Sequence, residues 1–361
     1  MELEELRSTW DALGEQDPLW AILTDPDKTG GRWDVSEFMQ TGREQADGYV
    51  VRLGSLGRRV SGRMLDFGCG VGRLTQGFAP SFAECTGVDI AASMIRRADR
   101  LNRFGPQVRY VHNDRPDLAV FPDGHFDLVF STIVLQHMPE ALSTAYIREF
   151  LRVCANGGTV VFQLPSRLLI HELPSDGFSA AIEADVPTTL AAGARVELTV
   201  SIRNTSTAAW PSGPGWYLAL GNHWLDADGS VVHLDDGRAS LGHDVEARGS
   251  TEITLNVTAP ATPGTYVLEL DMVQELVAWF GDRGSPAFRA RVEVEPAGSK
   301  DEPTSTPDSP PAPVIEMFAV PRETILELVR SCGGTILAVE ADDLASDFES
   351  FTYYVAVDTR P

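Results

Sequence analysis

Three glycines at alternate positions, Gly68, Gly70 and Gly72, follow directly after the apolar segment Arg63–Phe67. This arrangement is typical of a strand that turns sharply into a helix, because glycine accepts backbone angles and close contacts that other residues resist. Asp66 lies two residues before the first glycine. The turn should bring backbone N–H groups and a carboxylate to the carboxyl end of a strand, where α/β proteins bind their ligands.

Further short apolar segments alternate with amphipathic segments after this turn. Parallel strands need connections of about a dozen residues, usually a helix, so the alternation predicts a parallel sheet covered on both faces. We expect its next strands at Cys85–Val88, Val108–His112, Phe126–Thr132 and Thr159–Gln163.

The pattern changes after Pro165. Between about residues 180 and 296, segments such as 196–202 and 251–257 alternate apolar and polar side chains and are separated by Gly, Pro and Asp turns, which predicts a β-sandwich. Asp226–Ser230 lacks the remaining ligands of a calcium loop and predicts a hairpin turn.

The last part of the chain begins after residues 297–313, whose five prolines and lack of large apolar side chains predict a flexible linker. A helix is expected at 321–331, because Pro321 favours a first helical turn. Two strands follow at 335–340 and 351–357 without a helix between them, so they should form an antiparallel hairpin.

Together these segments predict an α/β fold with a seven-stranded, Rossmann-like sheet whose last strand is antiparallel, and an all-β sandwich inserted into that domain. The expected parts are an N-terminal helical segment or lid (1–45), the first part of the α/β domain (46–170), the inserted β-sandwich (180–296), the linker (297–313) and the second part of the α/β domain (314–361).

A second carboxylate limits which ligands the glycine turn can bind. Asp89 ends the second expected strand, 23 residues after Asp66, where it can accept hydrogen bonds from both ribose hydroxyls of a nucleoside. A dinucleotide-binding turn needs the spacing G-x-G-x-x-G for a pyrophosphate, whereas this chain has G-x-G-x-G preceded by an acid. That arrangement favours a ligand with an ammonium group and leaves an NAD-dependent oxidoreductase as the alternative.

The segments 65–72, 87–90 and 126–131 resemble the successive signatures of class I S-adenosylmethionine-dependent methyltransferases, over about residues 60–165. The resemblance implies that Asp66 and the loop residues Gly68, Cys69, Gly70 and Gly72 hold the methionine portion of the cofactor. By the same resemblance Asp89 holds the ribose, Ile90 lies on the adenine, Asn113 and Asp114 meet its amino group, and Ser131 is a further cofactor contact.

Methyl transfer from a sulfonium mainly requires positioning, with a base to accept the proton of the nucleophile. The candidate base is His137, just beyond the fourth expected strand, where parallel sheets place their ligands. The alternative is a histidine that packs or begins a helix. No metal site is predicted.

The net charge of −23 disfavours a nucleic-acid substrate, because binding to a phosphate backbone depends on clustered Lys and Arg. The motifs Asn-Pro-Pro-Tyr and Pro-Cys of base methylation are also missing. We therefore expect O- or N-methylation of a small molecule or a glycan. A non-catalytic scaffold, in which the sandwich binds a protein or a sugar, is a further alternative.

The expected sandwich resembles immunoglobulin-like, tryptophan-rich modules that accompany bacterial glycan-processing proteins. Trp210, Trp216, Trp224 and Trp279 would either stack on sugar rings or anchor the core of the sandwich, and the core is the commoner place for tryptophan.

The expected location is the bacterial cytoplasm. The acidic N-terminal segment lacks the apolar run of a secretory signal, and no segment reaches membrane-spanning length. The four cysteines, which include no C-x-x-C pair, are expected to be reduced. Only two lysines are present, which suggests a GC-rich genome.

Overall fold

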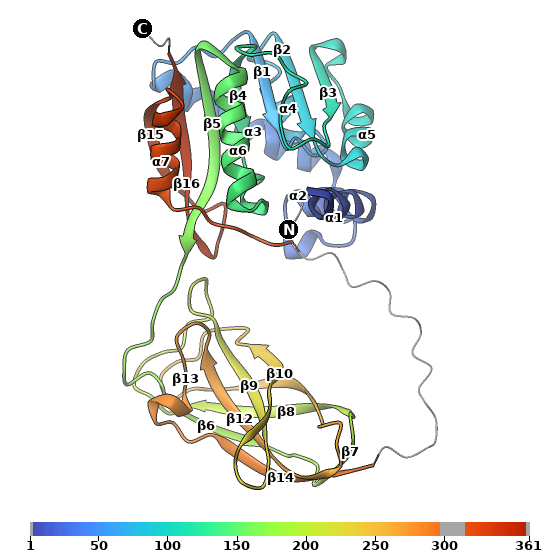
Figure 1. Ribbon diagram of the computed structural model, residues 1–361, viewed down its shortest axis with the longest axis vertical. Coiled ribbons are helices and arrows are strands. Elements are labelled where there is room, and N and C mark those ends of the chain that lie inside the picture. The colour runs from blue at the N-terminus through green and yellow to red at the C-terminus, as the bar shows by residue number, and fades with distance from the viewer. Residues whose placement is uncertain (1–2, 297–314, 359–361) are drawn as a thin grey trace. The chain divides into compact units, whose positions relative to one another are not determined.

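The computed structural model describes residues 3–296 and 315–358 (Figure 1). The predicted linker at 297–313 lies outside the described residues. The chain divides into two compact units, residues 1–168 with 309–361 and residues 169–308.

The first unit is built on a sheet of seven strands in the order β15-β16-β5-β4-β1-β2-β3. β1 to β5 are parallel to one another, and β16 is antiparallel to both β5 and β15. The prediction of a seven-stranded sheet with an antiparallel hairpin at its edge is therefore confirmed. The strands are β1 (Arg63–Phe67), β2 (Glu84–Asp89), β3 (Val108–His112), β4 (Phe126–Ser131), β5 (Cys154–Leu168), β15 (Thr335–Asp342) and β16 (Phe348–Val357).

β5 is much longer than the segment 159–163 expected from the sequence. β16 pairs with it from Gly158 to Leu168, so backbone hydrogen bonds continue well beyond the apolar stretch. Register with a distant partner, which the local pattern does not contain, sets the length of this strand.

Helices cover both faces of the sheet. Leu65 and Val129 pack with α6 and α7 on one face, whereas Met64 and Leu128 pack with α3 and α4 on the other. This alternation of neighbouring residues between two buried faces explains the nearly continuous apolar character of the strands. The helices are α1 (Leu3–Gln16), α2 (Pro18–Ile22), α3 (Val35–Ser55), α4 (Arg73–Phe78), α5 (Ala92–Leu101), α6 (Glu140–Val153) and α7 (Arg322–Ser331).

The N-terminal segment is helical, as expected, but its last helix continues beyond residue 45. Asp34 caps the start of α3 by accepting from the N–H groups of Ser36 and Glu37. The helix ends at Ser55, just before Gly57 adopts a φ of 70°. The expected boundary between residues 45 and 46 therefore falls inside one helix.

The second unit contains two β-sheets that share one hydrophobic core. The expected turn at Asp226–Ser230 joins two antiparallel strands, β9 and β10, as a hairpin. Trp210 and Trp224 are buried in the core, which is the more common of the two positions expected for these tryptophans. The strands are β6 (Ala180–Ala184), β8 (Arg195–Asn204) and β11 (Ser250–Thr258) in one sheet, and β7 (Thr189–Ala191), β9 (Leu218–Leu225), β10 (Val231–Ser240), β12 (Gly264–Gln274), β13 (Ala278–Trp279) and β14 (Phe288–Glu295) in the other.

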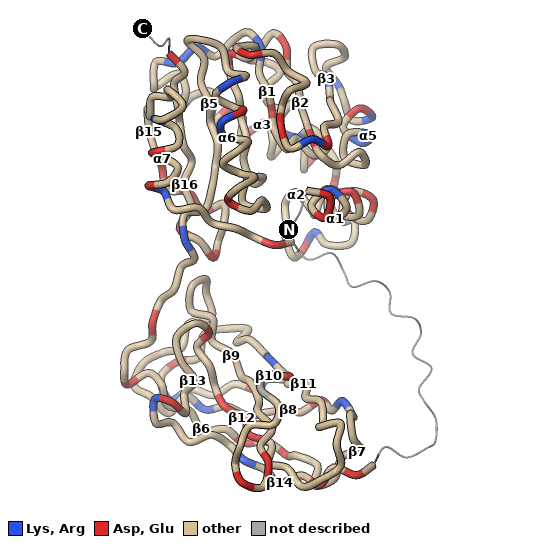
Figure 2. Tube along the Cα trace, in the orientation of Figure 1, with Lys and Arg blue, Asp and Glu red and all other residues tan. Residues whose placement is uncertain are grey.

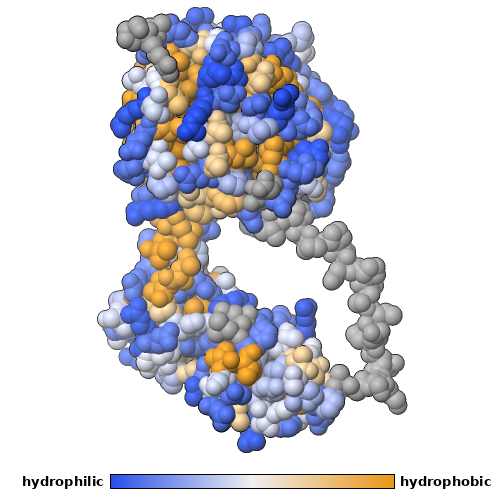
Figure 3. Space-filling model, viewed as in Figure 1, coloured by the Kyte–Doolittle hydropathy of each residue, from blue (hydrophilic) through white to orange (hydrophobic). Residues whose placement is uncertain are grey.

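The surface in Figure 3 is mainly hydrophilic on each unit, with scattered apolar patches. Among the described residues, no helix is both long enough and apolar enough to cross a membrane.

Candidate functional site

The glycine turn is fixed to the end of the neighbouring strand. The N–H groups of Gly68 and Cys69 donate to the carbonyl of Val88 at 2.8 and 3.1 Å, and the N–H of Gly70 donates to a carboxylate oxygen of Asp89 at 2.8 Å. Gly68 has a φ of 73°, and a Cβ atom there would lie 2.3 Å from the side chain of Val134. Position 68 therefore requires glycine both for its backbone angle and for space.

A cavity lies at the carboxyl ends of β1, β2 and β4, and it brings together most of the residues expected to hold a cofactor. Its wall contains eight of the predicted site residues: Asp66, Gly68, Cys69, Gly70, Asp89, Ile90, Asn113 and His137.

Three other predicted residues are not part of this wall. Gly72 precedes α4 as its N-cap, with a φ of 85°, and a Cβ atom there would lie 2.0 Å from the hydroxyl of Tyr110. Asp114 is exposed in the turn after β3, and Ser131 is buried at the end of β4. The structure gives Gly72 a role in the turn itself, whereas the proposed ligand contacts of Asp114 and Ser131 stay predictions.

The N-terminal helices form part of the cavity wall, through Leu6 and Trp10 of α1 and Ala21 and Ile22 of α2. These side chains are apolar, so they exclude water from the polar end of the cavity. Of these residues the sequence singles out Trp10, as part of an expected lid, and the lid itself stays a prediction.

Asp66 is buried beside the cavity. Burial raises the pKa of its carboxyl to about 6, and the hydrogen bond from the Thr75 hydroxyl, at 2.6 Å, opposes that rise. A buried carboxylate is stabilised when a cation approaches, so this wall of the cavity favours a positively charged group.

Arg73 is a cavity residue that the sequence analysis missed. Its guanidinium is buried, and its two terminal nitrogens donate to Thr41 at 3.2 Å and to Gln45 at 2.8 Å, both on α3. Its Nε atom is buried and has no hydrogen-bond partner among the described residues, and burial lowers the pKa of the group to about 10. An arginine directly after the glycine turn was the only signal in the sequence.

Asp89 presents a carboxylate whose two oxygens accept from the N–H groups of Gly70 and Ala91, each at 2.8 Å. Burial raises the pKa of this carboxyl, while the backbone donors oppose the rise. Each carboxylate oxygen can accept a further hydrogen bond, so Asp89 keeps the capacity to bind hydroxyl groups.

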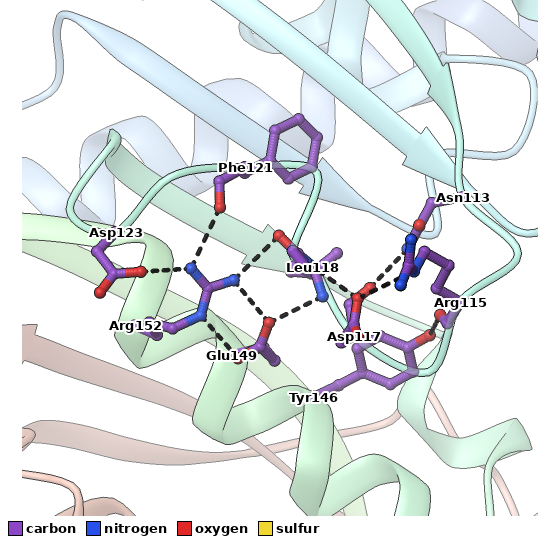
Figure 4. Close-up of polar contacts among 10 residues, drawn as sticks. Asn113, Arg115, Asp117, Leu118, Phe121, Asp123, Tyr146, Glu149 and Arg152 are labelled. Atoms are coloured by element: carbon purple, nitrogen blue, oxygen red, sulfur yellow. Dashed lines mark hydrogen bonds and ion pairs between the residues drawn. The ribbon is translucent and has the colours of Figure 1, made fainter.

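The loop after β3, which begins with Asn113, is held in place by α6 (Figure 4). Arg152 donates to the carbonyls of Leu118 and Phe121 at 3.0 and 3.2 Å, and Glu149 accepts from the N–H of Leu118 at 2.8 Å. Arg152 and Glu149 also pair with each other, at 2.6 Å. These contacts order the loop that contributes Asn113 to the cavity wall.

His137 lies in the cavity wall and is almost completely buried. Its Nδ1 atom is 2.9 Å from the carbonyl of Glu316, and its ring lies edge-on to the indole of Trp10, with centroids 5.1 Å apart. Burial lowers the pKa of the imidazole. The ring is therefore neutral at pH 7, as a proton acceptor must be.

Within the described residues, no group of three or more His, Cys, Asp or Glu side chains is placed to hold a metal ion. Burial raises the pKa of the Cys69 thiol in the cavity wall.

Comparison with known proteins identifies the segment around the glycine turn. The family described as "Methyltransferase domain" matches residues 64–158. Malonyl-[acyl-carrier protein] O-methyltransferase of Halorhodospira halophila is 37% identical over 149 residues, which cover 41% of this chain and 48% of that protein. Ubiquinone biosynthesis O-methyltransferase of Nitrosospira multiformis is 33% identical over 121 residues, or 32% of this chain and 50% of that protein.

The chain spans about half the length of these curated relatives. A crystal structure of an S-adenosylmethionine-dependent methyltransferase from Clostridium acetobutylicum aligns with 87% of this chain and 91% of its own, at 13% identity and a TM-score of 0.41. The family match covers the segment that contains the glycine turn. Residues 64–158 therefore match a methyltransferase domain.

Proposed function

We propose that the whole chain is an S-adenosylmethionine-dependent methyltransferase that transfers a methyl group to an oxygen or nitrogen atom of a small molecule or glycan. The observation that best supports this proposal is a pair of buried, opposite charges, Asp66 and Arg73, in the wall of one cavity. An α-amino acid group carries a matching ammonium and carboxylate.

The residues of the cavity fit this cofactor. Asp66 would hold the ammonium, and Arg73, whose Nε lacks a partner among the described residues, would hold the carboxylate. Asp89 would hold the ribose, and Ile90 and Asn113 would contact the adenine. When bound, S-adenosylmethionine supplies an electrophilic methyl group.

His137 is our candidate for the base that takes a proton from the acceptor. It combines a position in the cavity wall with a lowered pKa, which keeps its imidazole neutral. A general base with a pKa near neutrality, placed beside the nucleophile, increases the rate by about 10²–10⁴-fold. The apolar side chains of α1 and α2 would keep water away from the reacting atoms.

Charge supports a small acceptor over nucleic acid. The net charge is −23, and Figure 2 shows acidic residues throughout both units with Lys and Arg dispersed among them. Counterion release from a phosphate backbone needs a cluster of positive charge. The O-methyltransferase names of the relatives agree with a small-molecule acceptor.

For the second unit we propose an immunoglobulin-like sandwich that binds a sugar or a protein. Trp216 and Trp279 are only half-buried, in contrast to the two core tryptophans. The ring of Trp279 contacts the guanidinium of Arg238, 4.5 Å from the ring centroid, and the ring of Trp216 contacts that of His171, with centroids 5.1 Å apart. A sugar would stack on what these partners leave uncovered. We also propose a bacterial cytoplasmic location, which the buried free thiols of Cys69, Cys85 and Cys154 support.

Calorimetry with S-adenosylmethionine and with NADH tests the cofactor. We expect binding of the first, and preferential binding of NADH would instead identify an oxidoreductase. Turnover is then measured with a panel of small-molecule and glycan acceptors, and His137→Ala should lower kcat by about 10²–10⁴-fold. Cofactor binding without transfer to any acceptor would favour the non-catalytic scaffold.

The acceptor itself is sought by mass spectrometry of metabolites and glycans from a strain that lacks the gene. The product of the enzyme should be replaced there by a compound lighter by one methyl group.

A further inference from the structure

A buried chain of side-chain amides connects Gln163 of β5 to His137. Gln163, near the middle of β5, and Gln136, next to His137, are both almost fully buried. The chain continues from Gln163 to the hydroxyl of Ser350 on β16. Buried amides are costly unless each polar atom has a suitable partner, so the direction of every hydrogen bond in the chain is constrained.

At one end of this series of hydrogen bonds, a backbone donor fixes the orientation of the Gln163 amide. The backbone N–H of Ile133, which can only donate, lies 3.0 Å from Oε1 of Gln163. The amide nitrogen of Gln163 must therefore point the other way, where it donates to Oε1 of Gln136 at 3.1 Å and to Ser350 at 2.8 Å. Ile133 has a φ of 57°, which is unusual for a β-branched residue, so this hydrogen bond also holds a strained part of the cavity wall.

The orientation of the Gln163 amide determines that of the Gln136 amide, which in turn determines where His137 carries its proton. Because Oε1 of Gln136 accepts from Gln163, the amide nitrogen of Gln136 faces Nε2 of His137, at 3.3 Å. An amide nitrogen can only donate, so Nε2 must present its lone pair. At the far end, the carbonyl of Glu316 can only accept and lies 2.9 Å from Nδ1, so Nδ1 must carry the proton.

We propose that Gln163, acting through Gln136, is a positioning residue that holds the proton of His137 on Nδ1 and leaves the lone pair on Nε2. This proposal rests on the proposed function, in which His137 is the base. Nε2 takes the proton that the acceptor oxygen or nitrogen loses, while the methyl group leaves the sulfonium sulfur for that atom. The contact between Gln136 and Nε2 is long, so an acceptor hydroxyl or amine can replace it.

The opposite tautomer of His137 is incompatible with its hydrogen-bond partners. A proton on Nε2 would face the amide protons of Gln136, and a lone pair on Nδ1 would face the carbonyl oxygen of Glu316. Rotating the Gln136 amide would only move the conflict to Gln163. The contacts described for the ring are the Trp10 indole, the Gln136 amide and the Glu316 carbonyl, all uncharged, and the Glu316 side chain is exposed. Hydrogen-bond direction, not a neighbouring charge, thus selects the tautomer.

Gln163→Glu is the most direct test, because it keeps the shape of the side chain and reverses the direction of the hydrogen bond between residues 163 and 136. A carboxylate still accepts from Ile133, and the Ser350 hydroxyl can rotate to donate, but nothing donates to Gln136. The Gln136 amide should then rotate and present its oxygen to Nε2, which becomes protonated. We expect ¹⁵N NMR of histidine-labelled protein at pH 7 to show the proton on Nδ1 in the wild type. In the variant, Nε2 should be protonated and the pKa of His137 raised.

Several variants make the result interpretable. The chain has seven histidines, so the His137 signal is assigned by its loss in His137→Gln. Gln40→Glu, at an exposed position of α3, adds the same charge elsewhere and should change neither the tautomer nor turnover. Ser350→Ala removes a partner of Gln163 without reversing the chain and should leave the tautomer unchanged. If Gln163→Glu does not fold, Gln136→Glu should also protonate Nε2, because its carboxylate accepts from both neighbours.

The readouts separate this proposal from the proposed function. Gln163→Glu should lower kcat by about 10²–10⁴-fold and move the acid limb of the pH profile upward, with S-adenosylmethionine affinity unchanged within about threefold. A proton on Nε2 in the wild type, or unchanged ¹⁵N shifts in folded Gln163→Glu, would overturn the proposal even if methyl transfer is demonstrated. Failure to bind S-adenosylmethionine would instead overturn the proposed function, because the tautomer is measured without cofactor.

Discussion

At the scale of single residues, we expect Asp66 to make ligand binding depend on pH. Its pKa in the folded protein is about 6, against an ordinary value of 3.8, so the folded state binds more protons than the unfolded state between these values. Without ligand, the stability that this group contributes is full below about pH 4 and is lost as the pH rises through about 6.

A bound ammonium group should favour the ionised carboxylate of Asp66 and release its proton. We therefore expect proton release when S-adenosylmethionine binds at pH 5 to 6, and an affinity that rises toward pH 7. Calorimetry in buffers with different ionisation enthalpies measures the protons released.

Asp66→Asn should abolish that release and weaken binding by about 10–100-fold, because a charge-assisted hydrogen bond is lost. Asp99→Asn, which removes an exposed carboxylate from α5, is the matched control and should behave like the wild type. Unchanged proton release in Asp66→Asn would show that another group titrates.

At the scale of elements, the contact between α6 and the loop after β3 should stabilise the cofactor end of the sheet. Arg152→Met removes two hydrogen bonds to loop carbonyls and the pair with Glu149. We expect the free energy of unfolding to fall by about 1–3 kcal/mol, and hydrogen exchange in residues 113–123 to become faster. Arg148→Met changes an exposed arginine of the same helix and should have little effect.

The effect of Arg152→Met should also depend on pH. The hydrogen bond from Arg152 holds the pKa of Glu149 below its ordinary value of 4.5. The stability from this pair is therefore present above about pH 4.5 and is lost as the pH falls further. Denaturant unfolding should show a smaller difference between variant and wild type at pH 3.5 than at pH 7, because only the hydrogen bonds to the carbonyls of Leu118 and Phe121 remain at the lower pH.

At the scale of the whole molecule, we expect the first unit to bind the cofactor and the second unit to affect which acceptor is used. Every residue of the cavity wall belongs to the first unit. A chain without residues 169–308 should therefore bind S-adenosylmethionine within about threefold of the intact protein. Turnover on the acceptor should fall if the second unit binds it. Loss of cofactor binding by a folded deletion variant would contradict this division.

The sequence by itself determined the parallel strands, the hairpin beyond the second unit and the position of the glycine turn. These features depend on local patterns: apolar segments of strand length, helical connections and glycines that permit positive φ angles. Asp66 and Asp89 could also be chosen from the sequence, because both lie at the carboxyl ends of strands that are adjacent in such a sheet.

Only the tertiary structure decided the length of β5, the contribution of Arg73 and the hydrogen bonds of His137. β5 is extended by pairing with β16, nearly 200 positions later in the chain. Arg73 is oriented by Thr41 and Gln45 of α3, and His137 by Glu316. These side chains owe their orientation, burial and proton positions to partners brought close by folding, and no local sequence pattern contains that information.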